Sequence, residues 1–162
     1  MQISRGSKGG FFCFLSCATS FSYYKEYLPK MSYRYMPKSM VFSEETNDIA
    51  VKVVPTFLPD QSDVGRKEFV WTYNVVIENN SLKRVKLMRR HWSLTDGQGH
   101  TEEVVGAGVV GQQPVLEPGQ KYTYASHAVL RTSTGFMRGD YDMVDENGSH
   151  LKVSIPPFSL DE

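Results

Sequence analysis

The feature that most constrains this chain is a run of strict alternation over residues 69–78. Aromatic and β-branched residues are concentrated at every second position of the run, namely Phe69, Trp71, Tyr73, Val75 and Ile77. Successive side chains of a β-strand point to opposite faces, so a period of two places these residues together on one face. The pattern therefore predicts a β-strand with one buried face, and it places Trp71 in the core.

Shorter runs with the same period occur elsewhere and are separated by turn residues. They predict strands within residues 49–53, 88–94, 101–105, 122–125, 141–143 and 151–155. Asp96-Gly97 and Asn147-Gly148 lie between pairs of these runs, and Asn-Gly is the strongest short signal for a β-hairpin. No segment longer than about ten residues has helical periodicity. About seven short strands joined in this way predict an all-β fold, an antiparallel β-sandwich.

One connecting segment favours a particular kind of sandwich. The segment Leu116-x-Pro118-Gly119-x-x-Tyr122 resembles the loop that leads into the tyrosine corner of immunoglobulin-like folds. In that corner the tyrosine hydroxyl binds the backbone a few residues upstream.

The strand expected around residues 87–94 contains the motif Arg89-Arg90-His91-Trp92. Alternation assigns Met88, Arg90, Trp92 and Leu94 to the core face, and Leu87, Arg89, His91 and Ser93 to the opposite face. We expect Trp92 in the core, with Arg90 at its edge. A guanidinium can bind carboxylate or phosphate bidentately and an imidazole titrates near neutrality, so Arg89 and His91 are candidate contacts. A solvated Arg89–His91 pair without a ligand is the alternative.

The segment Gly106-Ala107-Gly108-Val109-Val110-Gly111 fits the spacing GxGxxG of dinucleotide-binding loops. Pro114 follows so closely that no helix can begin after the loop, and this excludes a Rossmann-type site. Two interpretations remain for Gly106, Gly108 and Gly111. They can serve a tight crossover between strands, or they can shape a concave nest of backbone N–H groups that binds an anion.

Neither metal binding nor catalysis is indicated by the remaining polar residues. The four histidines, His91, His100, His127 and His150, do not pair at the i, i+2 or i, i+4 spacings typical of metal ligands. His91, Asp96 and His100 flank one predicted hairpin and form a weak candidate cluster. There is no GxSxG nucleophile motif, and the acids are spread over turns. We therefore expect no enzyme activity, no bound metal and no cofactor.

Charge divides the chain into two parts. The whole sequence has 18 basic and 18 acidic residues, but residues 1–40 contain six basic residues and one acid. That stretch shows no sustained alternation, so we interpret it as a leader and residues 41–162 as the folded domain. We favour a start codon assigned too far upstream, so that the functional chain begins at Met31 or Met40. The alternative is a secretory or organellar targeting segment.

Composition also limits the cellular location and the binding partners that we expect for this protein. Both cysteines, Cys13 and Cys17, lie in the leader, so the domain cannot depend on disulfides, and a reducing, cytoplasmic location is expected. No apolar run reaches the roughly 18 residues of a membrane-spanning helix. The formal net charge of zero gives no global field that would attract nucleic acid or an anionic membrane. We therefore expect a soluble protein that binds neither.

Several separated motifs resemble those of the bacterial ApaG family. They are Phe57-Leu58-Pro59-Asp60-Gln61-Ser62, Val76-Ile77-Glu78-Asn79, Arg90-His91-Trp92, Val105-Gly106-Ala107-Gly108-Val109-Val110-Gly111-Gln112-Gln113-Pro114, Met137-Arg138-Gly139-Asp140-Tyr141 and Ile155-Pro156-Pro157-Phe158-Ser159-Leu160. The resemblance covers residues 49–160. It departs from the family pattern at Ala107, where an acid or proline is expected, and at Arg89, where a serine is expected.

This resemblance implies an immunoglobulin-like or fibronectin type III-like β-sandwich that acts as a protein-binding module, with no established reaction. We predict a non-catalytic module that binds a protein partner through Gly106, Gly108, Gly111, Arg89 and His91. The alternative is that the glycine-rich loop binds a phosphate-containing small molecule such as a nucleotide or pyrophosphate. The resemblance would connect that role with cobalt and magnesium homeostasis.

Overall fold

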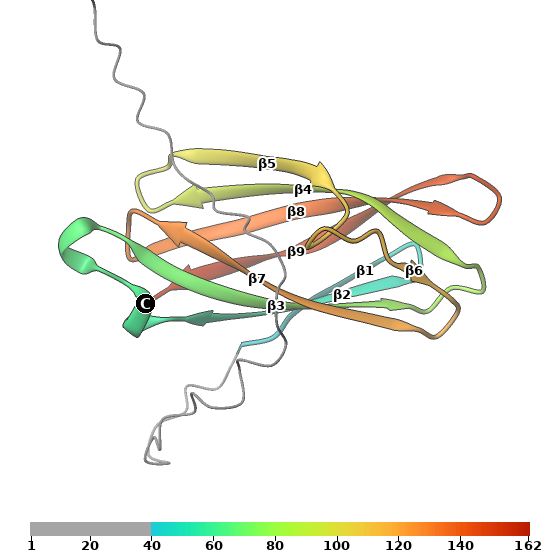
Figure 1. Cartoon of the computed structure of the whole chain (residues 1–162), viewed down its shortest axis with the longest axis horizontal. Coiled ribbons are helices and arrows are strands. Elements are labelled where there is room, and N and C mark those ends of the chain that lie inside the picture. The colour runs from blue at the N-terminus through green and yellow to red at the C-terminus, as the bar shows by residue number, and fades with distance from the viewer. Residues whose placement is uncertain (1–39) are drawn as a thin grey trace, which may run out of the picture.

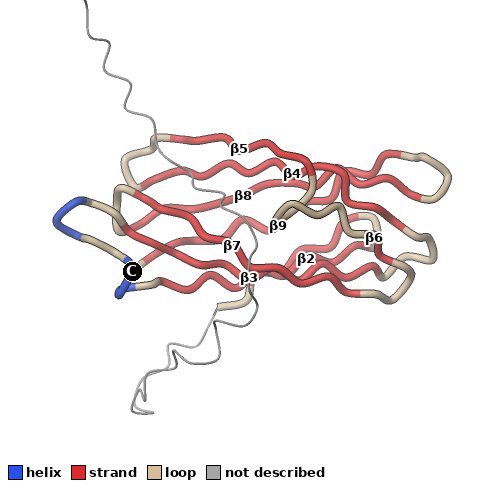
Figure 2. Tube along the Cα trace, in the orientation of Figure 1, coloured by secondary structure: helices blue, strands red, loops and turns tan. Residues whose placement is uncertain are grey.

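A computed structural model describes residues 40–162, which form two packed β-sheets (Figure 1). The strands are β1 (Phe42–Thr46), β2 (Ile49–Phe57), β3 (Phe69–Asn79), β4 (Val85–Asp96), β5 (Thr101–Ala107), β6 (Val115–Leu116), β7 (Lys121–Leu130), β8 (Thr134–Asp145) and β9 (His150–Asp161). Two 3-10 turns, η1 (Pro59–Gln61) and η2 (Val64–Arg66), lie between β2 and β3 (Figure 2). Among residues 40–162 there is no helix that could span a lipid bilayer. Residues 1–39, nearly all of the predicted leader, lie outside the described residues.

The strands pair only in antiparallel fashion within residues 40–162. One sheet has the order β1-β2-β3-β7, and the other has the order β5-β4-β8-β9 with β6 paired to β4. Strand β9 contacts β1 and β2, which closes one side of the sandwich. Strands β5 and β7 are the edge strands of the two sheets on the other side. That open side is where the glycine-rich loop lies.

The predicted all-β sandwich is confirmed. The seven expected runs are found as β2, β3, β4, β5, β7, β8 and β9, and both predicted hairpins form. The two further strands, β1 and β6, lacked a recognisable signal. β1 is an edge strand paired only to β2 within the described chain, and β6 has two residues paired to β4.

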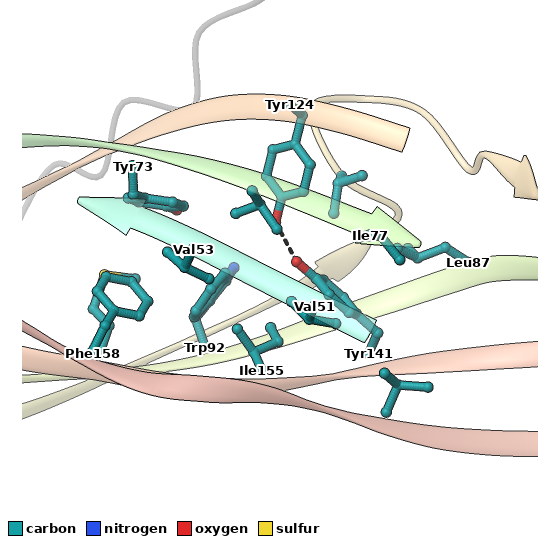
Figure 3. Close-up of a cluster of buried hydrophobic side chains, with 14 of the residues drawn as sticks. Val51, Val53, Tyr73, Ile77, Leu87, Trp92, Tyr124, Tyr141, Ile155 and Phe158 are labelled. Carbon is teal, nitrogen blue, oxygen red and sulfur yellow. Dashed lines mark hydrogen bonds between the residues drawn. The ribbon is translucent and has the colours of Figure 1, made fainter. Parts of the chain in front are cut away.

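The core lies between the sheets and is rich in aromatic rings (Figure 3). Trp71 and Trp92 are 4% and 3% exposed, which confirms both as core residues. The ring of Trp92 lies 5.5 Å from that of Tyr73 and 6.0 Å from that of Phe158, measured between centroids. These rings come from β4, β3 and β9, so the aromatic cluster joins both sheets.

Strand β4 departs from simple alternation, and one expectation was therefore wrong. Leu87, predicted on the face opposite the core, is fully buried, whereas Met88 is only half-buried. The pairing of β4 with β8 shifts register between Leu87 and Arg89. A β-bulge adds one residue to a strand and reverses the side on which later residues point. Leu87 before the bulge and Trp92 after it consequently share the core face.

Asp145 fixes the β8–β9 hairpin at one end of the sandwich. Its Oδ1 accepts hydrogen bonds from the backbone N–H groups of Asn147 and Ser149, at 2.9 and 2.8 Å. Its Oδ2 accepts one from Nζ of Lys83 at 2.9 Å, and its side chain is almost completely buried. The Lys83 hydrogen bond, followed by that from Ser149, lowers the pKa of Asp145 from 3.8 to about 2.

This lowered pKa predicts a specific loss of stability in acid. A carboxylate whose pKa is lower in the folded state stabilises the protein above its unfolded pKa, and the contribution disappears as the pH falls to its folded pKa. We expect the urea midpoint of the wild type to exceed that of Asp145→Asn above about pH 4, with the difference shrinking towards about pH 2. Lys83→Met removes the hydrogen bond that contributes most to the lowered pKa of Asp145. In this variant the stabilising effect of the Asp145 carboxylate should therefore be lost over a narrower range of pH. A difference between wild type and Asp145→Asn that does not vary with pH would contradict the assignment.

Candidate functional site

The glycine-rich loop leaves the end of β5 and folds into a tight hairpin. Val109 and Gln112 exchange two backbone hydrogen bonds, at 2.8 and 2.9 Å, across the turn. The residues between them, Val110 and Gly111, both have positive φ, at 47° and 73°. Two consecutive central residues with positive φ are characteristic of a type I′ turn.

The loop is attached to the bulge in β4. The N–H of Gly108 and the side-chain amide of Gln113 both donate to the carbonyl of Met88, each at 2.9 Å. The side chain of Val109 is fully buried in the core. The loop is therefore anchored by the backbone of β4 on one side and by a buried valine on the other.

Arg90 also holds the loop. Its Nη1 donates to the carbonyls of Gly108 at 2.8 Å and Ala107 at 3.2 Å. A Cβ at position 106 would lie 2.8 Å from the same Nη1, so glycine there leaves room for the guanidinium. The expectation that Arg90 shares a face with Trp92, at the edge of the core, is confirmed. Its partners are loop carbonyls.

Two buried tyrosines form a hydrogen bond inside the core. The hydroxyls of Tyr124 on β7 and Tyr141 on β8 are 2.5 Å apart and link the two sheets (Figure 3). Burial raises the pKa of Tyr124 well above its usual value, the nearby Tyr141 adds to this, and Arg90 opposes it. Burial also raises the pKa of Tyr141. Both hydroxyls are therefore neutral at physiological pH, and they form a hydrogen bond with each other.

Tyr122 ties the loop to β7. Its hydroxyl donates to Oε1 of Gln112 at 3.0 Å. A tyrosine corner would place this hydroxyl on the upstream backbone, whereas here its acceptor is a side-chain oxygen. Because Gln112 belongs to the loop and Tyr122 to the opposite sheet, this bond helps to close the open side of the sandwich.

The backbone amides of the loop are largely committed to internal partners. The N–H groups of Gly108, Val109 and Gln112 donate to carbonyls of Met88, Gln112 and Val109 respectively. β6 follows the loop, and no helix starts there within the described chain, as expected from Pro114. These three amides are not free to cradle an anion, so the structural interpretation of the glycines has the better support.

A row of ionisable side chains crosses the outer face of the β5-β4-β8-β9 sheet. Nε2 of His91 lies 2.5 Å from Oε2 of Glu103, and Nδ1 lies 3.4 Å from Oδ2 of Asp140. Nζ of Lys152 is 3.3 Å from the same Asp140 oxygen. The row thus joins one residue from each of four strands.

Sequence reasoning identified His91 but missed its two acidic partners. Glu103 and Asp140 are brought to it by strand pairing, since His91 lies opposite Val105 on β5 and Asp140 on β8. The weak His91–Asp96–His100 candidate is only half assembled. His100 Nδ1 lies 3.3 Å from Asp96, but His91 contacts the other two acids instead.

The predicted site residues lie on the paired strands β4 and β5 and on the loop that follows β5. Arg89 is exposed and pairs with Ala107 in the β4–β5 ladder, next to Gly106 and Gly108. His91 is on the same outer face, while Gly111 is at the turn of the loop. Among residues 40–162, no group of three or more His, Cys, Asp or Glu side chains has the arrangement of a metal site.

These features define a class of protein: a two-sheet antiparallel β-sandwich whose open side is closed by a glycine-rich hairpin loop. The chain belongs to the ApaG family, because the family model described as the ApaG domain matches residues 59–145. It is 49% identical over 121 residues to Protein ApaG of Methylocella silvestris, covering 75% of this chain and 93% of that protein. Protein ApaG of Paramagnetospirillum magneticum is 50% identical with the same coverage.

A solved structure supports the same assignment. The crystal structure of the putative ApaA protein from Bordetella pertussis is 43% identical and matches with a TM-score of 0.69. The match covers 70% of this chain and 93% of that chain. The ApaG resemblance drawn from the sequence motifs is therefore confirmed, and the two-sheet fold is that of a solved relative.

Proposed function

We propose that this protein is a non-catalytic protein-binding module whose contact surface is the tip of the glycine-rich loop and the adjoining outer face of β5 and β4. Val110, at the loop tip, is the observation that carries the proposal. It is a β-branched residue with a φ of 47°. It is also 37% exposed.

The conformation of Val110 is unfavourable for its residue type. A left-handed backbone costs an ordinary L-residue roughly 1–2 kcal/mol, and a β-branched residue adopts it rarely. Asn-Gly would suit this type I′ turn better than Val110-Gly111. Val109, not Val110, supplies the buried anchor of the loop. Val110 bears this strain while more than a third of its surface stays exposed, and backbone strain of this kind is found where a side chain serves recognition, so we assign Val110 to partner contact.

The surroundings of the loop suit a protein partner. Val105 on the outer face of β5 is 57% exposed and lies directly opposite His91. Exposed Arg89 lies on the same face. Apolar side chains, arginine and a polar rim are a composition typical of protein interfaces.

A non-catalytic role is supported by how the titratable groups are used. Both ring nitrogens of His91 lie against carboxylates of its own sheet, so its polar contacts are made within the domain. The buried hydroxyls of Tyr124 and Tyr141 are hydrogen-bonded to each other.

The absence of cysteine from residues 41–162 supports a reducing, cytoplasmic location for this module.

Replacing Val110 should separate stability from binding. We expect Val110→Asn to raise the free energy of unfolding by about 1 kcal/mol, because asparagine tolerates the left-handed backbone. The same variant should lose partner binding, because the apolar tip is gone. Val64→Asn is the matched control, since Val64 is an exposed valine in η2 without a positive φ. It should leave stability unchanged within about 0.5 kcal/mol.

Binding is measured by capture on immobilised wild-type, Val110→Asn and Val64→Asn proteins, followed by quantitative mass spectrometry. The proposal predicts proteins retained by the wild type and Val64→Asn and depleted from Val110→Asn. If no protein distinguishes Val110→Asn from the wild type, the loop tip is not the contact surface. A parallel NMR titration with pyrophosphate tests the phosphate alternative, which would be favoured by saturable shifts at Gly108 and Gly111.

A further inference from the structure

A cleft opens between the two sheets at the end of β5 opposite to the glycine-rich loop. There the β4–β5 hairpin faces the C-terminal end of β7, and Figure 1 shows both at the same end of the sandwich. The cleft has a volume of about 320 Å³. Its lining combines apolar side chains of β4 and β7 with four titratable ones, Asp96, His100, Glu102 and Arg131. This volume lies at the lower end of the range for small-molecule sites, roughly 300–1,000 Å³.

The apolar part of the lining comes from both sheets. Leu94 lies on β4, and Val129 and Leu130 end β7. Leu94 packs on the core, and Leu130 is itself part of it. The cleft therefore offers an apolar surface to a ligand's hydrocarbon part.

Three of the four titratable side chains in the cleft are already engaged. Oδ1 of Asp96 accepts the backbone N–H groups of Gln98 and His100, both at 2.9 Å. Oδ2 of Asp96 lies 3.3 Å from Nδ1 of His100, which pairs these two side chains. Arg131 also has an interaction partner.

Glu102 is the exception. It lies on the inner side of β5, half-buried and directly opposite Leu94 in the ladder. Within residues 40–162 its carboxylate has no hydrogen bond or ion pair, whereas its neighbour Glu103 on the outer side binds His91. This carboxylate lies beside the apolar lining with its acceptor positions open, so a cation placed against it would gain a charge-assisted hydrogen bond.

We propose that this cleft binds a small organic ammonium ion, a primary amine on a short apolar stem. The ammonium group pairs with the Glu102 carboxylate, and the stem packs on Leu94, Val129 and Leu130. A charge-assisted hydrogen bond to a carboxylate gives the site its preference for a cation over an alcohol or an anion. This site is separate from the loop tip and does not depend on the role proposed for Val110.

The test is an NMR titration of the full chain with n-butylammonium chloride at constant ionic strength, compared with butan-1-ol and sodium butyrate. We expect saturable shifts of the Leu94, Glu102 and Leu130 amides with the amine alone. Glu102→Gln, which keeps the side-chain shape, should weaken amine binding at least about ten-fold, equivalent to roughly 1.4 kcal/mol. Glu103→Gln, the adjacent residue on the opposite side of the strand, should change it less than about two-fold.

Two results would overturn the proposal. Equal affinities for butylammonium and butanol would mean that the carboxylate gives no selectivity. Equal weakening by Glu102→Gln and Glu103→Gln would mean that general surface charge, and not the cleft, attracts the amine. The comparison of the three ligands on the wild type needs no variant, so a poorly folding Glu102→Gln protein would not leave the proposal untested.

Discussion

Replacement of Trp92 by alanine should lower the free energy of unfolding by about 3–5 kcal/mol, the range for removing a large ring from a well-packed core. Trp92 lies in the core where both sheets meet, and its ring packs against those of Tyr73 and Phe158. Its surroundings are shaped to its size, since a Cβ at Gly139 would lie 3.0 Å from the indole ring and 2.3 Å from the His91 carbonyl. Such a tightly fitted site cannot collapse around alanine, and a cavity would remain.

The measurement is urea unfolding followed by far-ultraviolet circular dichroism, which does not depend on the removed indole. Trp92→Phe should lose less than Trp92→Ala, because it retains part of the aromatic contact. Val105→Ala is the surface control and should change stability by less than about 0.5 kcal/mol. If Trp92→Ala lost as little as this control, Trp92 would not be a core residue.

Strand β3 was predictable in detail because its alternation is unbroken. It pairs along nearly its whole length with β2 on one side and β7 on the other, with no register shift in either ladder. Phe69, Trp71, Tyr73, Val75 and Ile77 are all buried as expected. A period of two reliably indicates the buried face of a strand where both neighbouring strands pair with it in an unbroken register.

Strand β4 shows where this guide fails. Its bulge at Met88 reverses the side on which Leu87 was expected to point. The Met88 carbonyl accepts hydrogen bonds from Gly108 and Gln113, some twenty residues further along the chain. The bulge is thus associated with a contact between distant segments, which local alternation cannot encode.

The candidate site was predictable only in part, because it also depends on contacts between segments that are distant in the sequence. Of the three glycines that marked the loop in the sequence, Gly108 and Gly111 have a positive φ and Gly106 does not. Val110 also has a positive φ, and its residue type predicts the opposite. The acids beside His91, Glu103 and Asp140, lie 12 and 49 residues away along the chain and meet it only through the ladders of β4 with β5 and β8.

Alanine at Gly108 should be much more damaging than alanine at Gly111. Both glycines have positive φ, at 58° and 73°, so each substitution meets the left-handed penalty of roughly 1–2 kcal/mol. At Gly111 an added Cβ meets nothing within 4 Å, and backbone strain is the whole expected cost. At Gly108 the Cβ would lie 1.9 Å from the Gln112 carbonyl oxygen, which is part of the backbone.

The loop would have to open to admit this methyl group. The Val109–Gln112 hydrogen bonds and the Gly108 contact to Met88 would then be disturbed, together with the buried position of Val109. Overpacking of this kind adds roughly 1–3 kcal/mol to the strain, so we expect Gly108→Ala to lower the free energy of unfolding by about 2–5 kcal/mol. Urea unfolding of both variants gives the loss of unfolding free energy for each. The difference between the two losses is the steric cost of the methyl group at position 108. Equal losses would show that the loop adjusts freely at position 108, and the assignment of these glycines to a tight, core-anchored crossover would then be wrong.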